Sequence, residues 1–370
     1  MGVSAVLPPP HGGHWPEAGA DEVRMNWMWL EEAARFATEN ETPWPYDLRR
    51  HLEGGFFEAP PDNEILGPIR DRGAPNGLVC RSGLKILSWG DTRQVDFTFS
   101  AAKSYLSLLA GIAVFDRLIS DLDERVQRSV DDGGFSGPQN EQITWRQLLQ
   151  NTSEWEGVLF GKSDVIDRNR NLALEGKGRK GDPRPLQRPG EHWEYNDVRV
   201  NRLSLALLRL FRRPLPDVFS ERIMRPIGAS SDWSWHGYRT STVEIDGKRI
   251  ESVSGGTHWG GGMLTHAEDQ ARLGLLMLRD GVWNDQRILP PGWVAESVRP
   301  CALNPNYGLL WWLNTRHGRY KSVPESSFFA SGAGGNITWV DPDHDIVAVM
   351  RWLDPTAVDT FIRLIMQAVQ

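Results

Sequence analysis

A long, mostly apolar run, residues 105–115, begins one residue after the tetrapeptide Ser-Ala-Ala-Lys at residues 100–103. Leucine, alanine and valine side chains recur in this run at helical spacing, and further apolar side chains lie beside them. We therefore predict a helix that begins near Ser100 and is buried almost all round. The chain has 370 residues, which is enough for two domains or for one large domain with an insertion.

Ser100 and Lys103, at the start of this helix, are a candidate catalytic pair. A serine hydroxyl is a poor nucleophile at neutral pH, but an amine one helical turn away lies on the same face and can take its proton. The start of a helix also stabilises developing negative charge. The alternative is that Ser100 caps the helix and Lys103 is a surface charge, although a lysine at a helix N-terminus opposes the helix dipole.

A second Ser-x-x-Lys pattern runs from Ser82 to Lys85. It lies between two short strand-like runs, so we interpret Ser82 and Gly83 as a hairpin turn. The pattern by itself is therefore too short to identify an active site.

Net charge and hydropathy disfavour two classes of partner. The net charge is −7 and no long basic run occurs, which argues against nucleic acid. No apolar stretch reaches membrane-spanning length, and the first residues lack the features of a secretion signal. We expect a soluble, cytoplasmic protein without a membrane partner, and either a monomer or a homodimer.

Patterns typical of metal sites are missing from the sequence. Cys80 and Cys301 lie far apart without metal-like spacing, and the histidines show no zinc pattern. The acidic turn at residues 341–345 resembles the start of a calcium loop, but Ile346 stands where that loop needs glycine. We therefore expect no metal and no organic cofactor.

Strand patterns occur near both ends of the chain, with helical patterns between them. The expected strands lie at about residues 77–82, 84–89, 337–340 and 346–352. Thr144 and Thr265 each begin a capping-box pattern and are expected to start helices.

These elements predict one sheet built from both ends of the chain. We expect an α/β domain formed by residues 1–115 and 255–370, and a mainly helical domain inserted at residues 116–254. A long polar loop at residues 153–190 is expected to border the active site, because so long a loop in a compact domain is usually functional or disordered.

Tyr195 is a candidate partner for Lys103. It sits on a loop just before a predicted helix, where a phenol can point into a cleft and share the lysine proton. The alternative is a half-buried tyrosine that anchors the loop.

Small residues from Ala330 to Gly335 run into a predicted strand and let a substrate approach the backbone closely. A backbone N–H there could polarise a carbonyl beside the N–H of Ser100. The alternative is an ordinary glycine-rich start of a strand.

The order of these motifs resembles the class C β-lactamase-like serine hydrolases. That superfamily includes penicillin-binding DD-peptidases, family VIII-type esterases, D-aminopeptidases and 6-aminohexanoate-dimer hydrolases. The resemblance covers about residues 75–370, and the 6-aminohexanoate-dimer hydrolases are most similar at residues 190–205 and 329–349. It implies a fold of the β-lactamase/DD-peptidase type: an α/β (α+β) domain with a mainly antiparallel sheet flanked by helices, plus an all-helical domain.

The resemblance also implies roles for individual residues. Ser100 would attack an ester or amide carbonyl of a small molecule and form an acyl-enzyme, which water would then release. Lys103 and Tyr195 would be the proton-transfer pair. The backbone N–H groups of Ser100 and Ala333 would form the oxyanion hole.

Two positions depart from the family pattern. The family's Tyr-x-Asn ends here in Asp197, which can pair with Lys103 and keep it charged, leaving Tyr195 as the proton acceptor. The family's Lys/His-Thr-Gly strand falls on Ala330, Ser331 and Gly332. The missing lysine argues against efficient lactam hydrolysis and favours an ester or amide without the carboxylate that this lysine binds in penicillins.

We expect the substrate pocket to draw on the polar loop and on an aromatic wall. Aromatic residues of this kind are more often packing residues than substrate contacts. Asp164, Asp167 and Arg168 could bind a charged end of the substrate, but a solvated loop is the commoner reason for such charges. The candidate substrate-binding residues are Trp155, Trp193, Trp259, Asp197, Ser331 and Gly332, with Phe160 as a further aromatic candidate.

Several alternatives stay open at this stage. The enzyme could be a carboxylesterase or an amidase, and β-lactamase activity is expected to be weak or absent. A penicillin-binding-like sensor that acylates without turnover, or a binding protein, is the alternative outside turnover enzymes.

Overall fold

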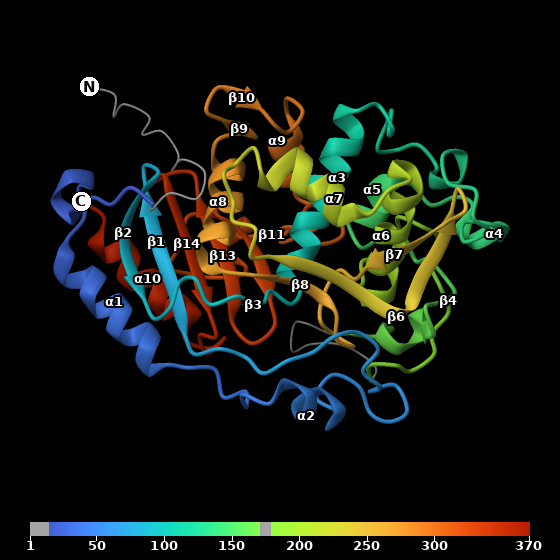
Figure 1. Cartoon of the computed structure of the whole chain (residues 1–370), viewed down its shortest axis with the longest axis horizontal. Helices are drawn as coiled ribbons and strands as arrows, with labels where there is room; N and C mark the ends of the chain where they lie inside the picture. The colour runs from blue at the N-terminus through green and yellow to red at the C-terminus, as the bar shows by residue number, and fades with distance from the viewer. Residues whose placement is uncertain (1–14, 171–178) are drawn as a thin grey trace.

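The computed structural model describes residues 15–170 and 179–370. Its larger sheet has six strands, all paired antiparallel, in the order β11-β12-β13-β14-β1-β2. The strands are β1 (Asn76–Arg81), β2 (Leu84–Trp89), β11 (Trp312–Leu313), β12 (Phe328–Gly332), β13 (Asn336–Asp341) and β14 (Ile346–Arg351). Because β1 pairs with β14, the two ends of the chain meet in the middle of this sheet (Figure 1).

Helices cover both faces of this sheet. The helices α1 (Trp27–Glu39) and α10 (Val358–Ala368) pack on one face, while α3 (Ala101–Phe115) and α8 (Ala267–Leu278) lie on the other (Figure 1). Strand β14 is almost entirely apolar because both of its faces are buried. Ile346, Ala348 and Met350 belong to the core that includes α1 and α10, whereas Val347 and Val349 belong to the core that includes α3 and α8. A strand buried on both faces has no polar side. The expected α/β fold with a mainly antiparallel sheet is confirmed.

A smaller, four-stranded sheet lies beside α3, in the order β3-β8-β6-β7. Its strands are β3 (Asp96–Phe97), β6 (Ser234–Ile245), β7 (Lys248–Val253) and β8 (Gly262–Thr265). The segment 116–254 thus contributes the long β6–β7 hairpin in addition to its helices, which are α4 (Gly137–Asn140), α5 (Trp145–Leu149), α6 (Asp197–Phe211) and α7 (Leu215–Phe219). The remaining α-helices and strands are α2 (Leu48–Glu53), β4 (Val158–Leu159), β5 (Lys162–Ser163), β9 (Val282–Trp283), β10 (Gln286–Arg287) and α9 (Trp293–Ser297).

Local predictions agree with the structure except at one helix start. The helix α3 is buried at every residue from Ala101 to Ala113, as predicted. Ser82 and Gly83 adopt left-handed backbone angles in the β1–β2 turn, and Thr144 forms the expected capping box with Gln147. The predicted capping box at Thr265 is wrong, because Thr265 is the last residue of β8. The His266 ring caps α8 instead, since its Nδ1 accepts a hydrogen bond from the backbone N–H of Asp269.

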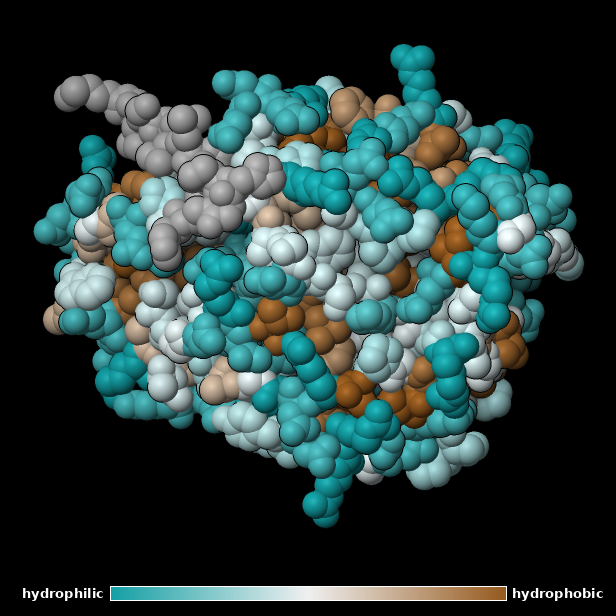
Figure 2. Space-filling model, viewed as in Figure 1, coloured by the Kyte–Doolittle hydropathy of each residue, from teal (hydrophilic) through white to brown (hydrophobic). Residues whose placement is uncertain are grey.

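The molecular surface is mainly polar on the face shown in Figure 2, where apolar side chains lie in separate groups between hydrophilic ones. Both cysteines are buried free thiols. Among the described helices, none has both the length and the hydrophobicity needed to cross a bilayer.

Candidate active site

Ser100 sits on a sharp turn between β3 and α3. The preceding residue, Phe99, has a left-handed backbone with φ of 49°, an uncommon conformation that concentrates at functional sites. The Ser100 hydroxyl makes no capping hydrogen bond with α3. It accepts one from the Lys103 ammonium instead, with 2.9 Å between Nζ and Oγ. The interpretation of Ser100 as a helix cap is therefore wrong, and the hydroxyl is directed toward the lysine.

Lys103 is fully buried and pairs with Asp197, the first residue of α6. Its Nζ lies 2.5 Å from Oδ1 of Asp197. Burial by itself would lower the pKa of Lys103, but the Asp197 carboxylate outweighs it and the pKa of Lys103 is raised. Burial likewise opposes ionisation of Asp197, yet Lys103 and Arg170 hold its pKa well below the usual range. Lys103 is therefore an ammonium at neutral pH, which agrees with the expectation drawn from an aspartate at position 197.

Tyr195 precedes α6 and lies beside the same lysine. The Lys103 Nζ is 5.0 Å from the centre of the Tyr195 ring, and the Arg170 guanidinium is 5.1 Å from it. The ring stacks on Trp312 with 5.6 Å between centroids. Tyr195 is 3% exposed, so it is held by packing while two cations face its ring.

Strand β12 approaches Ser100 closely, and a glycine permits this. A side chain at Gly332 would place its Cβ 2.0 Å from the carbonyl oxygen of Thr98, two residues before Ser100. Only glycine fits such an approach. Gly332, Ala333 and Ser331 consequently line one cavity together with Ser100 and Tyr195.

This cavity has a volume of about 650 Å³. Trp193 lines it, as predicted, and Trp312, Arg170 and Arg319 line it without having been predicted. A volume of this size suits a small molecule.

Among the residues predicted to bind substrate, Trp155, Phe160, Trp259 and Asp197 do not line the cavity. The Trp155 indole is 3% exposed and donates a hydrogen bond to the Gly134 carbonyl at 2.7 Å. Trp259 is completely buried and donates to the Asp62 carbonyl. Both indoles satisfy their N–H groups inside the protein, so they are packing residues.

A second layer of buried charges lies behind Asp197. The His258 ring contacts Asp197 at 3.2 Å through Nδ1 and Glu58 through Nε2. Asp167 accepts a hydrogen bond from the backbone N–H of Asp197 at 2.8 Å. Lys180 pairs with both Glu58 and Asp167.

Cations compensate the carboxylates of this layer. Glu58, Asp167 and Asp197 face Lys103, Arg170 and Lys180, so equal numbers of acidic and basic side chains meet there. Donor atoms of Glu58, Asp167 and His258 lie within 4.8 Å of one another, close enough to hold a metal ion. The Lys180 ammonium already contacts both carboxylates, which makes the cluster a charge-compensated network rather than a metal centre.

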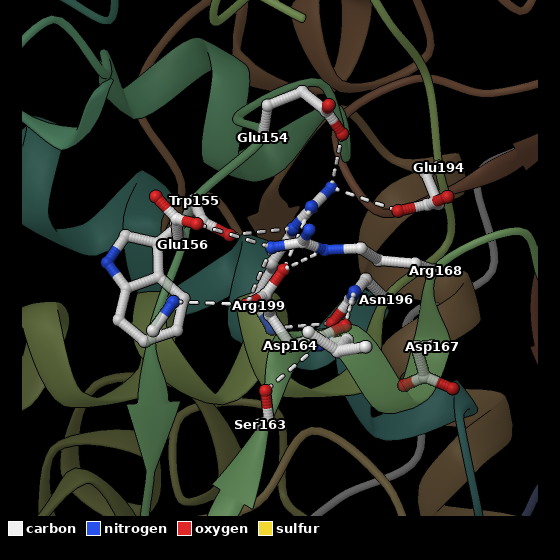
Figure 3. A network of polar contacts seen from close by, with 12 residues as sticks. Glu154, Trp155, Glu156, Ser163, Asp164, Asp167, Arg168, Glu194, Asn196 and Arg199 are labelled. Atoms are coloured by element: carbon white, nitrogen blue, oxygen red, sulfur yellow. Dashed lines mark hydrogen bonds and ion pairs between the residues drawn. The ribbon is translucent and has the colours of Figure 1, made fainter. Parts of the chain in front are cut away.

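Another network of buried charges, centred on Arg199 of α6, fixes the polar loop that precedes Tyr195 (Figure 3). The Arg199 side chain is 1% exposed; it lies 2.6 Å from Glu154 and 3.3 Å from Asp164, and it also contacts Glu194 at 3.2 Å. Arg168 pairs with Asp164 at 2.9 Å. Asp164, Asp167 and Arg168 are thus buried and do not line the cavity, contrary to both interpretations of the sequence.

Comparison with known proteins gives the family and the fold. A family model described as Beta-lactamase matches residues 95–355, and no curated protein matches the chain. A putative 6-aminohexanoate-dimer hydrolase from Bacillus anthracis superimposes with a TM-score of 0.58 at 16% identity, over 95% of this chain and 84% of that one. EstCE1, a hydrolase with promiscuous acyltransferase activity, gives 0.57 at 18% identity, over 92% and 98%. A penicillin-binding protein homologue from Caulobacter crescentus gives 0.56 at 16% identity, over 90% and 96%.

Proposed function

Because this chain belongs to the beta-lactamase family, we propose that it is a serine hydrolase that cleaves an ester or amide bond of a small molecule through an acyl-enzyme on Ser100. One observation carries the proposal: a buried ammonium, Lys103, lies 2.9 Å from a serine hydroxyl at the mouth of a helix, in a cavity that also holds a tyrosine. This arrangement fits an activated nucleophile.

In the proposed reaction, Ser100 Oγ attacks the substrate carbonyl carbon while its proton passes to the Tyr195–Lys103 pair. Lys103 is already charged, so the acceptor is Tyr195, which takes the proton as a phenolate, and Lys103 holds the serine hydroxyl in place. The N–H groups of Ser100 and Ala333 bind the oxyanion. The pair then protonates the leaving group, and a water molecule releases the acyl group by the reverse path.

The scissile bond could be an ester or an amide. Similar structures carry both descriptions, an amide-dimer hydrolase and an esterase-like hydrolase. We propose weak or absent β-lactamase activity, because Ala330 places no cation on β12. The ratio of kcat/KM for a matched ester and anilide separates carboxylesterase from amidase.

A burst assay tests the proposal. The protein is mixed with p-nitrophenyl butyrate in a stopped-flow instrument, and the quenched protein is analysed by intact mass and peptide mapping. We expect a burst of p-nitrophenol and one butyryl group on Ser100. If well-folded protein is acylated by no ester, anilide or β-lactam, the proposal fails and the alternative of a binding protein is favoured.

The Asp197→Asn variant restores the family's amide and tests how Lys103 is kept charged. Without the carboxylate, burial dominates and the pKa of Lys103 is expected to fall. The basic limb of the pH profile of Ser100 acylation should therefore move to lower pH, measured between pH 6 and pH 10. Asp246→Asn, which removes an exposed carboxylate paired with Arg212, is the control and should leave the profile in place. An unchanged profile in Asp197→Asn would contradict the proposed electrostatic role.

A further inference from the structure

The cavity contains an arginine, Arg319, that no carboxylate compensates among residues 15–170 and 179–370. The other cavity arginine, Arg170, pairs with Asp167 and Asp197. His192 lies 3.9 Å from Glu194. Arg319 is half-buried and makes no such ion pair with any described residue, so the cavity wall carries one uncompensated positive charge.

Packing holds the Arg319 guanidinium in place. Its Nη2 donates a hydrogen bond to Ser331 Oγ at 2.8 Å. The group lies over the Trp312 ring at 4.5 Å and near the Tyr320 ring at 5.3 Å. The backbone N–H of Arg319 donates to the Asn314 side chain at 3.2 Å. A guanidinium fixed in this way loses little entropy when a ligand binds.

Part of its hydrogen-bonding capacity is unused. The Arg319 Nε is buried and has no hydrogen-bond partner among the described atoms. Because this nitrogen is enclosed by the protein, a ligand in the cavity meets the terminal guanidinium nitrogens instead. The planar guanidinium can donate two parallel hydrogen bonds to a carboxylate, and these bonds are stronger than those to a neutral acceptor.

The position of Arg319 relates it to the proposed bond cleavage. Its partner Ser331 precedes Gly332, the residue that approaches Thr98, and Ser331 and Ser100 line the same cavity. A group held at Arg319 therefore lies in the cavity that Ser100 also lines. Ala330 places no cation on β12, but Arg319 reaches the cavity from the segment between β11 and β12.

We propose that Arg319 binds a carboxylate of the substrate, so the molecule cleaved is a small ester or amide that carries a carboxylate close to the scissile bond. This inference rests on the proposed function of Ser100. The substrate anion balances the charge of Arg319, while Arg170, already paired, contributes none. The carboxylate can belong to the acyl part or to the leaving group, and the two arms of the experiment distinguish them.

The experiment compares charged and uncharged esters. On the acyl side, mono-p-nitrophenyl glutarate is compared with its carboxamide analogue; on the leaving-group side, the acetyl ester of m-hydroxybenzoate is compared with that of m-hydroxybenzamide. We expect the wild type to favour the carboxylate in one arm by about tenfold to a hundredfold in kcat/KM, the range for a hydrogen bond to a charged group. Equal rates in both arms would overturn the inference.

Variants assign that preference to the arginine. Arg319→Gln should abolish the ratio between charged and uncharged esters, and Arg319→Lys should keep part of it, because a lysine retains the charge without the planar donors. Arg316→Gln removes an exposed arginine from the same segment and should keep the full ratio. A ratio that persists in Arg319→Gln would overturn the inference, with folding checked by circular dichroism.

The two proposals fail in different ways. If uncharged esters acylate Ser100 at the same rate as charged ones, only the carboxylate inference fails. If no ester in either arm acylates Ser100, the proposed function fails and the inference fails with it.

Discussion

The Ser100→Ala variant is expected to lose the burst completely and to fall by about 10³-fold or more in kcat/KM for any ester that the wild type hydrolyses. The methyl side chain cannot form the acyl-enzyme, and the oxyanion donors then act only on attack by water. The hydroxyl caps no backbone N–H of α3, so its removal should leave the helix intact. Stopped-flow kinetics and intact mass measure both effects.

The chain offers a matched control for this variant. Ser82→Ala removes the serine of the second Ser-x-x-Lys pattern, which lies in the β1–β2 turn. It should retain the burst and the wild-type rate, because that turn is not part of the cavity wall. Activity that survives Ser100→Ala, or that disappears in Ser82→Ala with the fold intact, would contradict the assignment of Ser100.

The Arg199→Met variant is expected to have the largest effect on stability. Methionine fills much of the volume but leaves Glu154, Asp164 and Glu194 without their central cation. Removing one partner of a buried ion pair typically costs about 3–5 kcal/mol. We expect a loss at the lower end of this range, because Arg184 still contacts Glu154 and Glu194, and Arg168 still contacts Asp164. Urea unfolding at pH 7 measures the loss. Arg49→Met, which breaks an exposed pair with Glu53, should cost about 0.3–0.5 kcal/mol.

The effect of Arg199→Met should also depend on pH. Burial opposes ionisation of Glu154, but its hydrogen bonds with Arg184 and the charge of Arg199 lower its pKa to about 2. A carboxyl whose pKa is lower in the folded state contributes stability above its ordinary pKa, 4.5, and loses it as the pH falls toward 2. The difference in unfolding free energy between wild type and variant should therefore narrow below about pH 4.5. A difference that stays constant down to pH 3 would contradict this account of Glu154.

Local sequence patterns predicted the elements that carry the candidate site. The apolar run after Lys103 predicted a helix buried on all sides, and the structure contains it as α3. The turn residues Ser82 and Gly83 predicted the β1–β2 hairpin, and the strand patterns at about residues 337–340 and 346–352 predicted β13 and β14. These features depend on neighbours in the chain, which a sequence displays directly. The start of α8 was missed because Thr265 extends β8, and pairing with β3 and β6 prevailed over the capping pattern.

Residue types alone did not show which side chains reach the cavity. Trp155 and Trp193 look alike in sequence, but the first is enclosed by the core and the second lines the cavity. His258 and Glu58 are in contact although they lie 200 residues apart in the chain. Arg319 carried no signal that distinguished it from other arginines.

The sequence by itself determined the helix that presents Ser100 and Lys103, the tyrosine before α6, and the replacement of the family's amide by Asp197. Each of these follows from short-range spacing or from residue identity. Only the tertiary structure decided which cations are compensated: Lys103, Arg170 and Arg199 meet carboxylates from distant segments, whereas Arg319 meets none among the described residues. Charge compensation depends on distances between segments that fold together, and a linear order of residues does not contain those distances.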